Sequence, residues 1–130
     1  MKRSPFLQPL SREHHTALSL ARACERAAQS GDAAQIAATS RRVVMAFPAE
    51  LDPHFQVEET ALLPRLQHAG SETLVRRTLD DHARLRALRD RVGREDAAAL
   101  AEFGALLAAH VRFEERELFP AIERQLESGL

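Results

Sequence analysis

The 130-residue sequence contains no tryptophan, no tyrosine, a single cysteine and no long apolar run. A helix that spans a membrane needs about 18 consecutive apolar residues, so no membrane partner is expected. Cys24 has no second cysteine for an intrachain disulfide, which is typical of proteins in a reducing compartment. Pro5 and Pro9 interrupt the N-terminal segment, which therefore lacks the apolar core of a signal peptide. We expect a cytoplasmic protein.

The charge balance lacks an excess of either sign. Lysine and arginine total 18 against 19 aspartates and glutamates, which gives a formal net charge of −1. Nucleic-acid-binding surfaces usually carry a basic excess that neutralises phosphates, so no nucleic-acid partner is expected. The hydrophobic fraction of 45% excludes a disordered chain. A chain of this length is expected to form one domain, covering residues 1–130.

Residues that favour β-strands are also scarce, whereas alanine, leucine, arginine and glutamate are abundant. The sequence therefore predicts an all-α fold. Residues that end or start helices divide it into four helical segments, near residues 11–30, 33–68, 72–92 and 96–127. Short connections make consecutive helices antiparallel, and the simplest closure is an up-down-up-down four-helix bundle.

The second helical segment contains Pro48, Pro53 and Pro64. A proline inside a helix removes a backbone donor and crowds the carbonyl four residues earlier. We expect either a kink near residues 48–53 or a break, with a second short helix starting around Asp52.

Polar residues interrupt the apolar stripe of every helical segment. They are His14, His54, Glu58, His82, His110 and Glu114. In the second and fourth segments the glutamate follows its histidine by four residues, so the two share a helix face. In the third segment we expect Leu79 and Leu85 to flank the histidine on the core face. A single inward histidine is more often a hydrogen-bonded core residue than a metal ligand.

The coincidence of these polar residues predicts a metal site. Burying an unpaired carboxylate costs several kcal/mol, and pairing with histidines would offset only part of this cost. A bound cation would offset more, since carboxylate and imidazole are ligands for transition metals. Iron is the first choice, and zinc and manganese are the alternatives. Binding should weaken as the pH falls through about 6.5, where free imidazole gains a proton.

The second and fourth segments share the pattern H-x-x-x-E-E-x-x-L-[LF]-P, over residues 54–64 and 110–120. Each half of the chain thus supplies two histidines and one glutamate, which suits two metal ions rather than one. With bridging glutamates, about eight ligand bonds would leave about two open positions on each octahedral ion. Such a site can react with a small ligand. The acids that follow within the pattern are either solvated neighbours or acceptors for the ligand histidines; they are Glu59, Glu115 and Glu117.

These residues resemble the hemerythrin-like (HHE cation-binding) family over roughly residues 10–125, because a single histidine alternates with H-x-x-x-E along the chain. The resemblance implies a non-haem di-iron centre with two irons per chain and an oxo or hydroxo bridge. It implies terminal ligands at His14, His54, His82 and His110, and bridging ligands at Glu58 and Glu114. His15 is an alternate first ligand by its spacing to Leu18, but the helical neighbours of His14 are more apolar.

The oxygen-carrying hemerythrins resemble this chain but place a further histidine where the sequence has Arg86. His68 cannot replace it, because ten residues of helix beyond Glu58 span about 15 Å. The resemblance thus favours a protein that senses or reacts with oxygen, nitric oxide or peroxide, or senses iron status, in a stress response. The alternatives are a reversible oxygen carrier and a metal-stabilised scaffold that docks a protein partner on its arginine-rich third helix. Those arginines are Arg76, Arg77, Arg84, Arg86, Arg89, Arg91 and Arg94.

Overall fold

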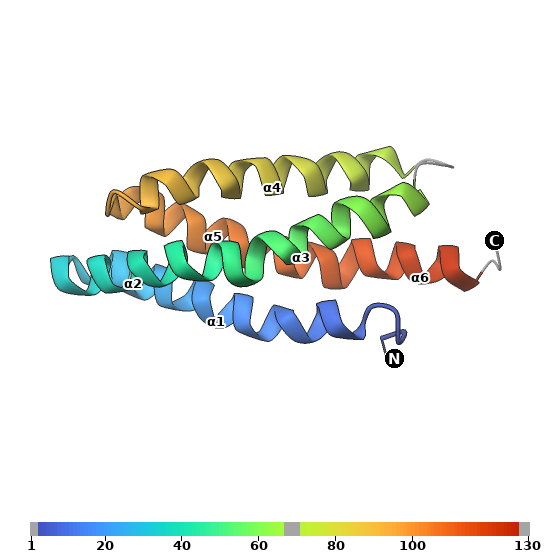
Figure 1. The fold of residues 1–130 in the computed structure, drawn as a ribbon, viewed down its shortest axis with the longest axis horizontal. Helices are drawn as coiled ribbons and strands as arrows, with labels where there is room; N and C mark the ends of the chain where they lie inside the picture. Colours follow the sequence, from blue (N-terminus) through green and yellow to red (C-terminus); the bar gives the residue numbers. More distant parts are fainter. Residues whose placement is uncertain (1–2, 67–70, 128–130) are drawn as a thin grey trace.

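The computed structural model describes residues 3–66 and 71–127, and every regular element in these ranges is a helix. The predicted all-α fold is confirmed. The chain runs along the bundle four times: through α1 (Gln8–Ser30), a first composite helix, α4 (Glu72–Val92) and a second composite helix (Figure 1). In the described part of the chain, none of the helices combines the length and the apolar character needed to cross a membrane.

Each composite helix is a series of helical elements with no irregular residue between them. The first consists of α2 (Ala33–Ala46), η1 (Phe47–Leu51), α3 (Asp52–Val57), η2 (Glu58–Leu62) and η3 (Leu63–Leu66). The second consists of α5 (Ala97–Phe113), η4 (Glu114–Leu118) and α6 (Phe119–Glu127). Three of these elements, η1, η2 and η4, are π-helical turns. The predicted end of the second segment, at 67–68, lies outside the described residues.

Local capping explains the boundary between α1 and α2. Asp32 accepts a hydrogen bond from the N–H of Ala34 and so caps α2. Gly31 ends α1 with φ at 66°, a left-handed conformation that suits glycine. The first helix starts earlier than predicted, at Gln8, because Pro9 is tolerated in a first turn, where its missing N–H needs no helical partner.

The π-turns adapt the composite helices to their prolines. The residues before Pro53, Pro64 and Pro120 each donate their N–H to the carbonyl five residues earlier, instead of four. A proline crowds the carbonyl four residues before it, and a turn that is wider by one residue relieves this contact. At residues 48–53 the helix is therefore not broken, although α3 does begin at Asp52.

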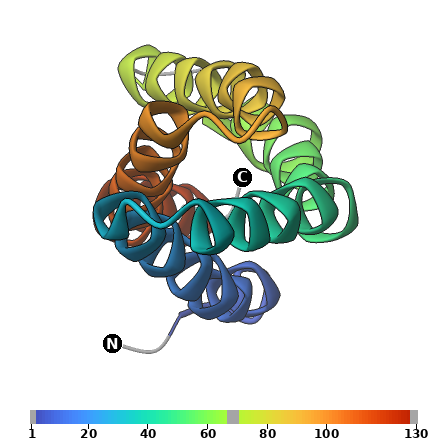
Figure 2. The same cartoon turned by 90° about the vertical axis from the view of Figure 1, so that its left-hand side faces the viewer.

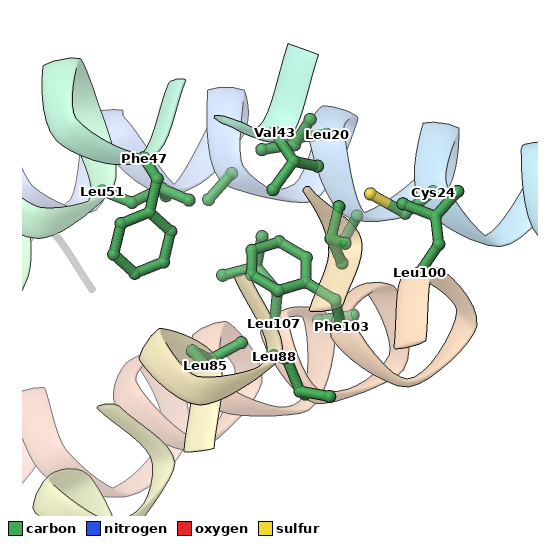
Figure 3. Packing of buried hydrophobic residues seen from close by; sticks show 14 of the residues in the cluster. Leu20, Cys24, Val43, Phe47, Leu51, Leu85, Leu88, Leu100, Phe103 and Leu107 are labelled. Atoms are coloured by element: carbon green, nitrogen blue, oxygen red, sulfur yellow. The ribbon is translucent and has the colours of Figure 1, made fainter. Parts of the chain in front are cut away.

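The four rods close around two apolar clusters. α1 packs against α2 and α5, and α4 packs against the same two helices (Figure 2). One cluster fills the end of the bundle near the α1–α2 connection and includes Val43, Phe47 and Phe103 (Figure 3). The other includes Leu62 and Leu118 and fills the end that holds the termini. The polar residues singled out in the sequence lie between the two clusters.

The third helix turns His82 and Leu85 inward as predicted, and Leu79 departs from the prediction. Leu79, which we expected on the core face, is 42% exposed, whereas Thr78 and Asp81 are buried. The hydroxyl of Thr78 donates to the carbonyl of Leu74, and the Asp81 carboxylate lies 2.9 Å from Nδ1 of His110. The apolar pattern was misleading here because polar groups with partners occupy the inward face.

Candidate metal centre

All six residues predicted as ligands converge at the middle of the bundle. They are His14 on α1, His54 on α3, Glu58 on η2, His82 on α4, His110 on α5 and Glu114 on η4. Every one of these side chains is buried, and both glutamates are 0% exposed. The alternate residue, His15, is exposed and belongs to neither group of potential ligand atoms found in the described chain.

The potential ligand atoms form two groups that share both glutamates. In the first ligand group the glutamates are joined by His14 and His54, and in the second by His82 and His110. Within each group the ligand atoms all lie within 4.8 Å of one another. Each group takes one histidine from α1 or α4 and the other from a composite helix. The sequence repeat predicts this arrangement.

Each histidine directs its Nε2 atom toward the shared glutamates. Nε2 of His14 lies 2.8 Å from Oε1 of Glu114. The matching contact in the other half, from Nε2 of His82 to Oε1 of Glu58, is 2.9 Å. In the composite helices, Nε2 of each histidine lies 3.0 Å from the carboxylate of the glutamate four residues later. The Nε2 atoms are thus the ones available to a shared ion.

The other nitrogen, Nδ1, contacts a carboxylate outside the two groups in every case. The pairs are His14 with Glu115 (2.6 Å), His54 with Glu13 (2.7 Å), His82 with Glu59 (2.7 Å) and His110 with Asp81 (2.9 Å). The acid is always the residue before a ligand histidine or the residue after a shared glutamate. A hydrogen bond at Nδ1 fixes the ring orientation and makes Nε2 a better ligand.

The sequence identified two of these four outer acids. Glu59 and Glu115 contact histidines predicted as ligands, whereas Glu117, which we named with them, is exposed. Glu13 and Asp81 were missed. Their signal was an acid directly before the ligand histidine of each single helix, at matching positions in the two halves.

Arginines hold three of the outer acids. Arg3 lies 3.2 Å from Glu115, and Arg77 lies 3.0 Å from the Asp81 carboxylate. Arg86 lies 2.9 Å from Glu59. Arg86 therefore supports a histidine through an acid, at the position where the oxygen-carrying relatives were expected to have a further ligand. His68 lies outside the described residues.

The centre leaves buried polar atoms without hydrogen bonds. These atoms are Oε2 of Glu58, Oε2 of Glu114 and Nε2 of His110. Although each lies within ion-pair distance of a neighbour in the centre, the directions do not suit hydrogen bonds. Buried polar atoms without partners cost free energy, and a cation among them would satisfy all three. Imidazole with carboxylate is a ligand set for a transition metal, so the residues fit a resident metal ion.

When the centre holds no metal, protons on the histidines supply part of the positive charge that the buried carboxylates need. Burial by itself would lower the pKa of His54, but the nearby carboxylates of Glu114 and Glu58 raise it to about 11. Burial is also outweighed at His110, where the charge of Glu114 and a hydrogen bond to Asp81 raise the pKa well above its usual value. Burial would raise the pKa of Glu114, but the charge of His110 holds it well below its usual value.

Metal binding is therefore expected to release protons well above pH 6.5. A metal must displace the proton on His54, whose pKa is about 11. The affinity should keep rising from about pH 6.5 to about pH 9, beyond the range in which a free imidazole loses its proton. Calorimetric titration with Zn²⁺, in buffers of different ionisation enthalpy at about pH 8, measures the protons released. Zero release at that pH would contradict the raised pKa.

The stability of the metal-free fold should decrease as the pH rises, whereas the metal affinity should increase. The pKa of His54 is higher in the folded chain than in the unfolded chain. Its pairing with the glutamates therefore stabilises the fold fully below about pH 6.5, and this contribution is lost as the pH rises toward 11. Thermal unfolding of the metal-free protein should show a lower Tm at about pH 10 than at about pH 7.

Comparison with known proteins agrees with this geometry. The family model described as the hemerythrin HHE cation binding domain matches residues 6–123. A search of the curated proteins and a search of the solved structures each found no match. The matched range includes both ligand groups and all four outer acids. Since the match covers nearly the whole sequence, the chain belongs to the hemerythrin HHE cation-binding domain family.

Proposed function

We propose that this protein is a non-haem di-iron protein that senses or reacts with a small ligand, such as oxygen, nitric oxide or peroxide. The observation that carries the proposal is the pair of ligand groups sharing Glu58 and Glu114. Two groups with two shared carboxylates suit two ions better than one. Four imidazoles among the ligands favour iron, while zinc and manganese remain alternatives for the same atoms.

Bound iron would supply the ligand-binding and redox chemistry, and the chain supplies the side chains that would hold it and fixes their orientation. The ring of Phe55 stacks on His82, with ring centroids 4.1 Å apart. The ring of Phe119 stacks on His14, with centroids 5.3 Å apart. Together with the outer acids, these rings hold the imidazoles in place.

One outer acid links the buried centre to solvent. The side chain of Glu13 is 57% exposed, yet its Oε1 atom lies 2.7 Å from Nδ1 of the buried His54. This contact can hold or pass a proton between solvent and that imidazole. A centre that reduces oxygen or peroxide needs such a proton supply, whereas a purely structural metal site does not.

Elemental analysis of protein purified without a histidine tag tests the proposal. We expect about two irons per chain and an absorption band in the near ultraviolet from the bridged pair. Nitric oxide, oxygen or peroxide should change this spectrum. An iron-loaded protein whose spectrum ignores all three would contradict the proposal and favour the metal-stabilised scaffold, especially if chelation also lowers the Tm strongly.

A scaffold would dock its partner on the arginine-rich surface of α4, but most of these arginines already pair with acids of the same chain. Most arginines of α4 and the following turn pair with acidic residues of the same molecule. These arginines are Arg77, Arg84, Arg86, Arg89 and Arg91. Such pairing leaves less positive charge for a protein partner. We also place the protein in the cytoplasm, because Cys24 is a buried thiol and a reducing environment preserves it.

A further inference from the structure

An open groove runs along the surface between α1 and the first composite helix, which lie side by side (Figure 1). Its volume is about 580 Å³. Leu20 of α1 is 2% exposed and lies at the bottom of the groove. Ala38, Ala46 and Ala49 line the other side, and their short side chains leave the space open. The surface between the two helices therefore contains an apolar hollow that solvent reaches.

Met45 also lines this groove, and it is 69% exposed. No other large apolar side chain in the described parts of the chain is as exposed. Arg41 and Arg42 line the groove beside it. Methionine and arginine are both enriched at protein interfaces, and the flexible thioether adapts to the surface that it contacts. This combination favours a protein as the occupant of the groove.

The groove carries charges of both signs that have no partner within the molecule. Arg42 and Glu50 both line it, and neither makes an ion pair or a side-chain hydrogen bond with any residue of 3–66 or 71–127. Eight residues separate them along the chain, which is about 12 Å of helix. Ala46 lies midway between them. Two unpaired charges of opposite sign thus lie at the two ends of one short surface.

A second copy of the chain matches these charges in one orientation. When two identical helices pack antiparallel about a twofold axis at Ala46, Arg42 of each copy faces Glu50 of the other. The twofold axis places the same flank of both helices together, and both charged residues lie on the flank that borders the groove. A parallel pair would instead place Arg42 opposite Arg42, and like charges across an interface repel. The surface is therefore self-complementary for an antiparallel pair.

The groove is not a requirement of the bundle, because the second half of the chain bridges the matching position. When the predicted ligand histidines of the two halves are aligned, Thr16 and Ala46 in the groove correspond to Arg84 and Glu102. Those two residues join α4 to α5, with Nε of Arg84 2.7 Å from Oε2 of Glu102. The position of Met45 is an alanine in the second half. A groove lined by an exposed methionine and unpaired charges is thus a feature of the first half.

We propose that a second copy of this chain occupies the groove, with the two α2–η1 segments antiparallel and crossing near Ala46. Met45 of each copy packs into the groove of the other, above Leu20, and each Arg42 pairs with Glu50 across the interface. A single helix pair buries less than the roughly 1,200 Å² of a standard interface, so the dimer is weak and forms at high protein concentration. The inference goes beyond the proposed function and does not depend on a metal ion.

Sedimentation equilibrium of the full chain tests the proposal directly. We expect almost entirely monomer at about 5 µM and mostly dimer at about 1 mM, with a dissociation constant of about 100 µM. A chain that stays monomeric over this range would overturn the proposal and leave the groove to another occupant. A small organic molecule would then be the candidate, because ligand pockets usually measure about 300–1,000 Å³.

Two neighbouring exposed residues locate the interface. Met45→Lys places a charge at the centre of the contact and should weaken self-association at least about tenfold. Val44→Lys adds the same charge at the adjacent residue, which is exposed but does not line the groove. This control should stay within about twofold of the unmodified chain, and the Tm of each variant shows whether the fold is kept. Equal weakening in the two variants would overturn the assignment of the interface to the groove.

Exchanging the two charges tests the antiparallel pairing. Arg42→Glu places two carboxylates opposite each other in both contacts of the dimer, and Glu50→Arg places two guanidinium groups there. Each variant alone should self-associate at least about tenfold more weakly than the unmodified chain. An equimolar mixture of the two variants should form a dimer within about threefold of the original affinity, because both contacts again join opposite charges. A mixture that associates no better than the separate variants would overturn the antiparallel pairing.

Discussion

Replacing Glu114 with alanine is expected to abolish the paired metal centre, and Glu58→Ala should have the same effect. Each glutamate belongs to both ligand groups, so one substitution removes a ligand from both potential ions. Each also lies close to a buried imidazole: Glu58 is 2.9 Å from Nε2 of His82, and Glu114 is 3.0 Å from Nε2 of His110. Iron should fall from about two per chain to one or none, with loss of the near-ultraviolet band. Elemental analysis and the absorption spectrum of the same sample measure both effects.

Neighbouring histidines provide the matched control for this prediction. His14 is buried in the first ligand group, whereas His15 is exposed on the same turn of α1. His14→Ala should lose metal, and His15→Ala should keep nearly all of it. Equal losses in the two histidine variants would contradict the ligand assignment. A circular dichroism spectrum of each variant shows whether a loss of metal reflects a loss of helix.

Gly104→Ala is expected to destabilise the fold strongly. A Cβ atom at this position would lie 2.8 Å from the backbone oxygen of Ala21 and 2.9 Å from Cβ of Cys24, so α1 and α5 would have to separate. Alanine gains about 1 kcal/mol in helix propensity over glycine. Overpacking costs about 1–3 kcal/mol or more, and contact with backbone favours the upper end of that range. We expect the free energy of unfolding to fall by about 2 kcal/mol in urea titrations.

Gly93→Ala is the control for the same type of substitution. The nearest atom to a Cβ at Gly93 lies 3.4 Å away, and the residue has an ordinary helical φ of −60°. Its free energy of unfolding should change by less than about 1 kcal/mol. A Gly104→Ala variant as stable as the unmodified protein would show that α1 and α5 approach less closely than the structure indicates.

The helices and the inward ligand residues could be predicted because they depend on local periodicity. In an α-helix, residues four apart lie on one face, so a histidine and a glutamate at that spacing must point the same way. The repeat in the composite helices, with a proline six residues after Glu58 and after Glu114, also contained the signal for the π-turns. Recognising that signal requires knowing that the wider turn relieves the proline contact.

The outer acids could be predicted only in part, because they reach across to other rods. Glu13 lies on the exposed side of α1, and its contact with His54 depends on the distance and rotation between α1 and α3. Asp81 was overlooked for the same reason, and the exposure of Leu79 shows that the apolar pattern misplaced one edge of the buried face of α4. Helix rotation about its own axis depends on the packing of all four rods.

The sequence alone determined that this chain forms four amphipathic helices that bury histidines and glutamates at one level. Which residues share a helix face depends only on their spacing along the chain. Tertiary packing decided which ring nitrogen faces the centre and which acid supports each imidazole. These features depend on the distances between helices, which the close packing of the side chains from all of them determines.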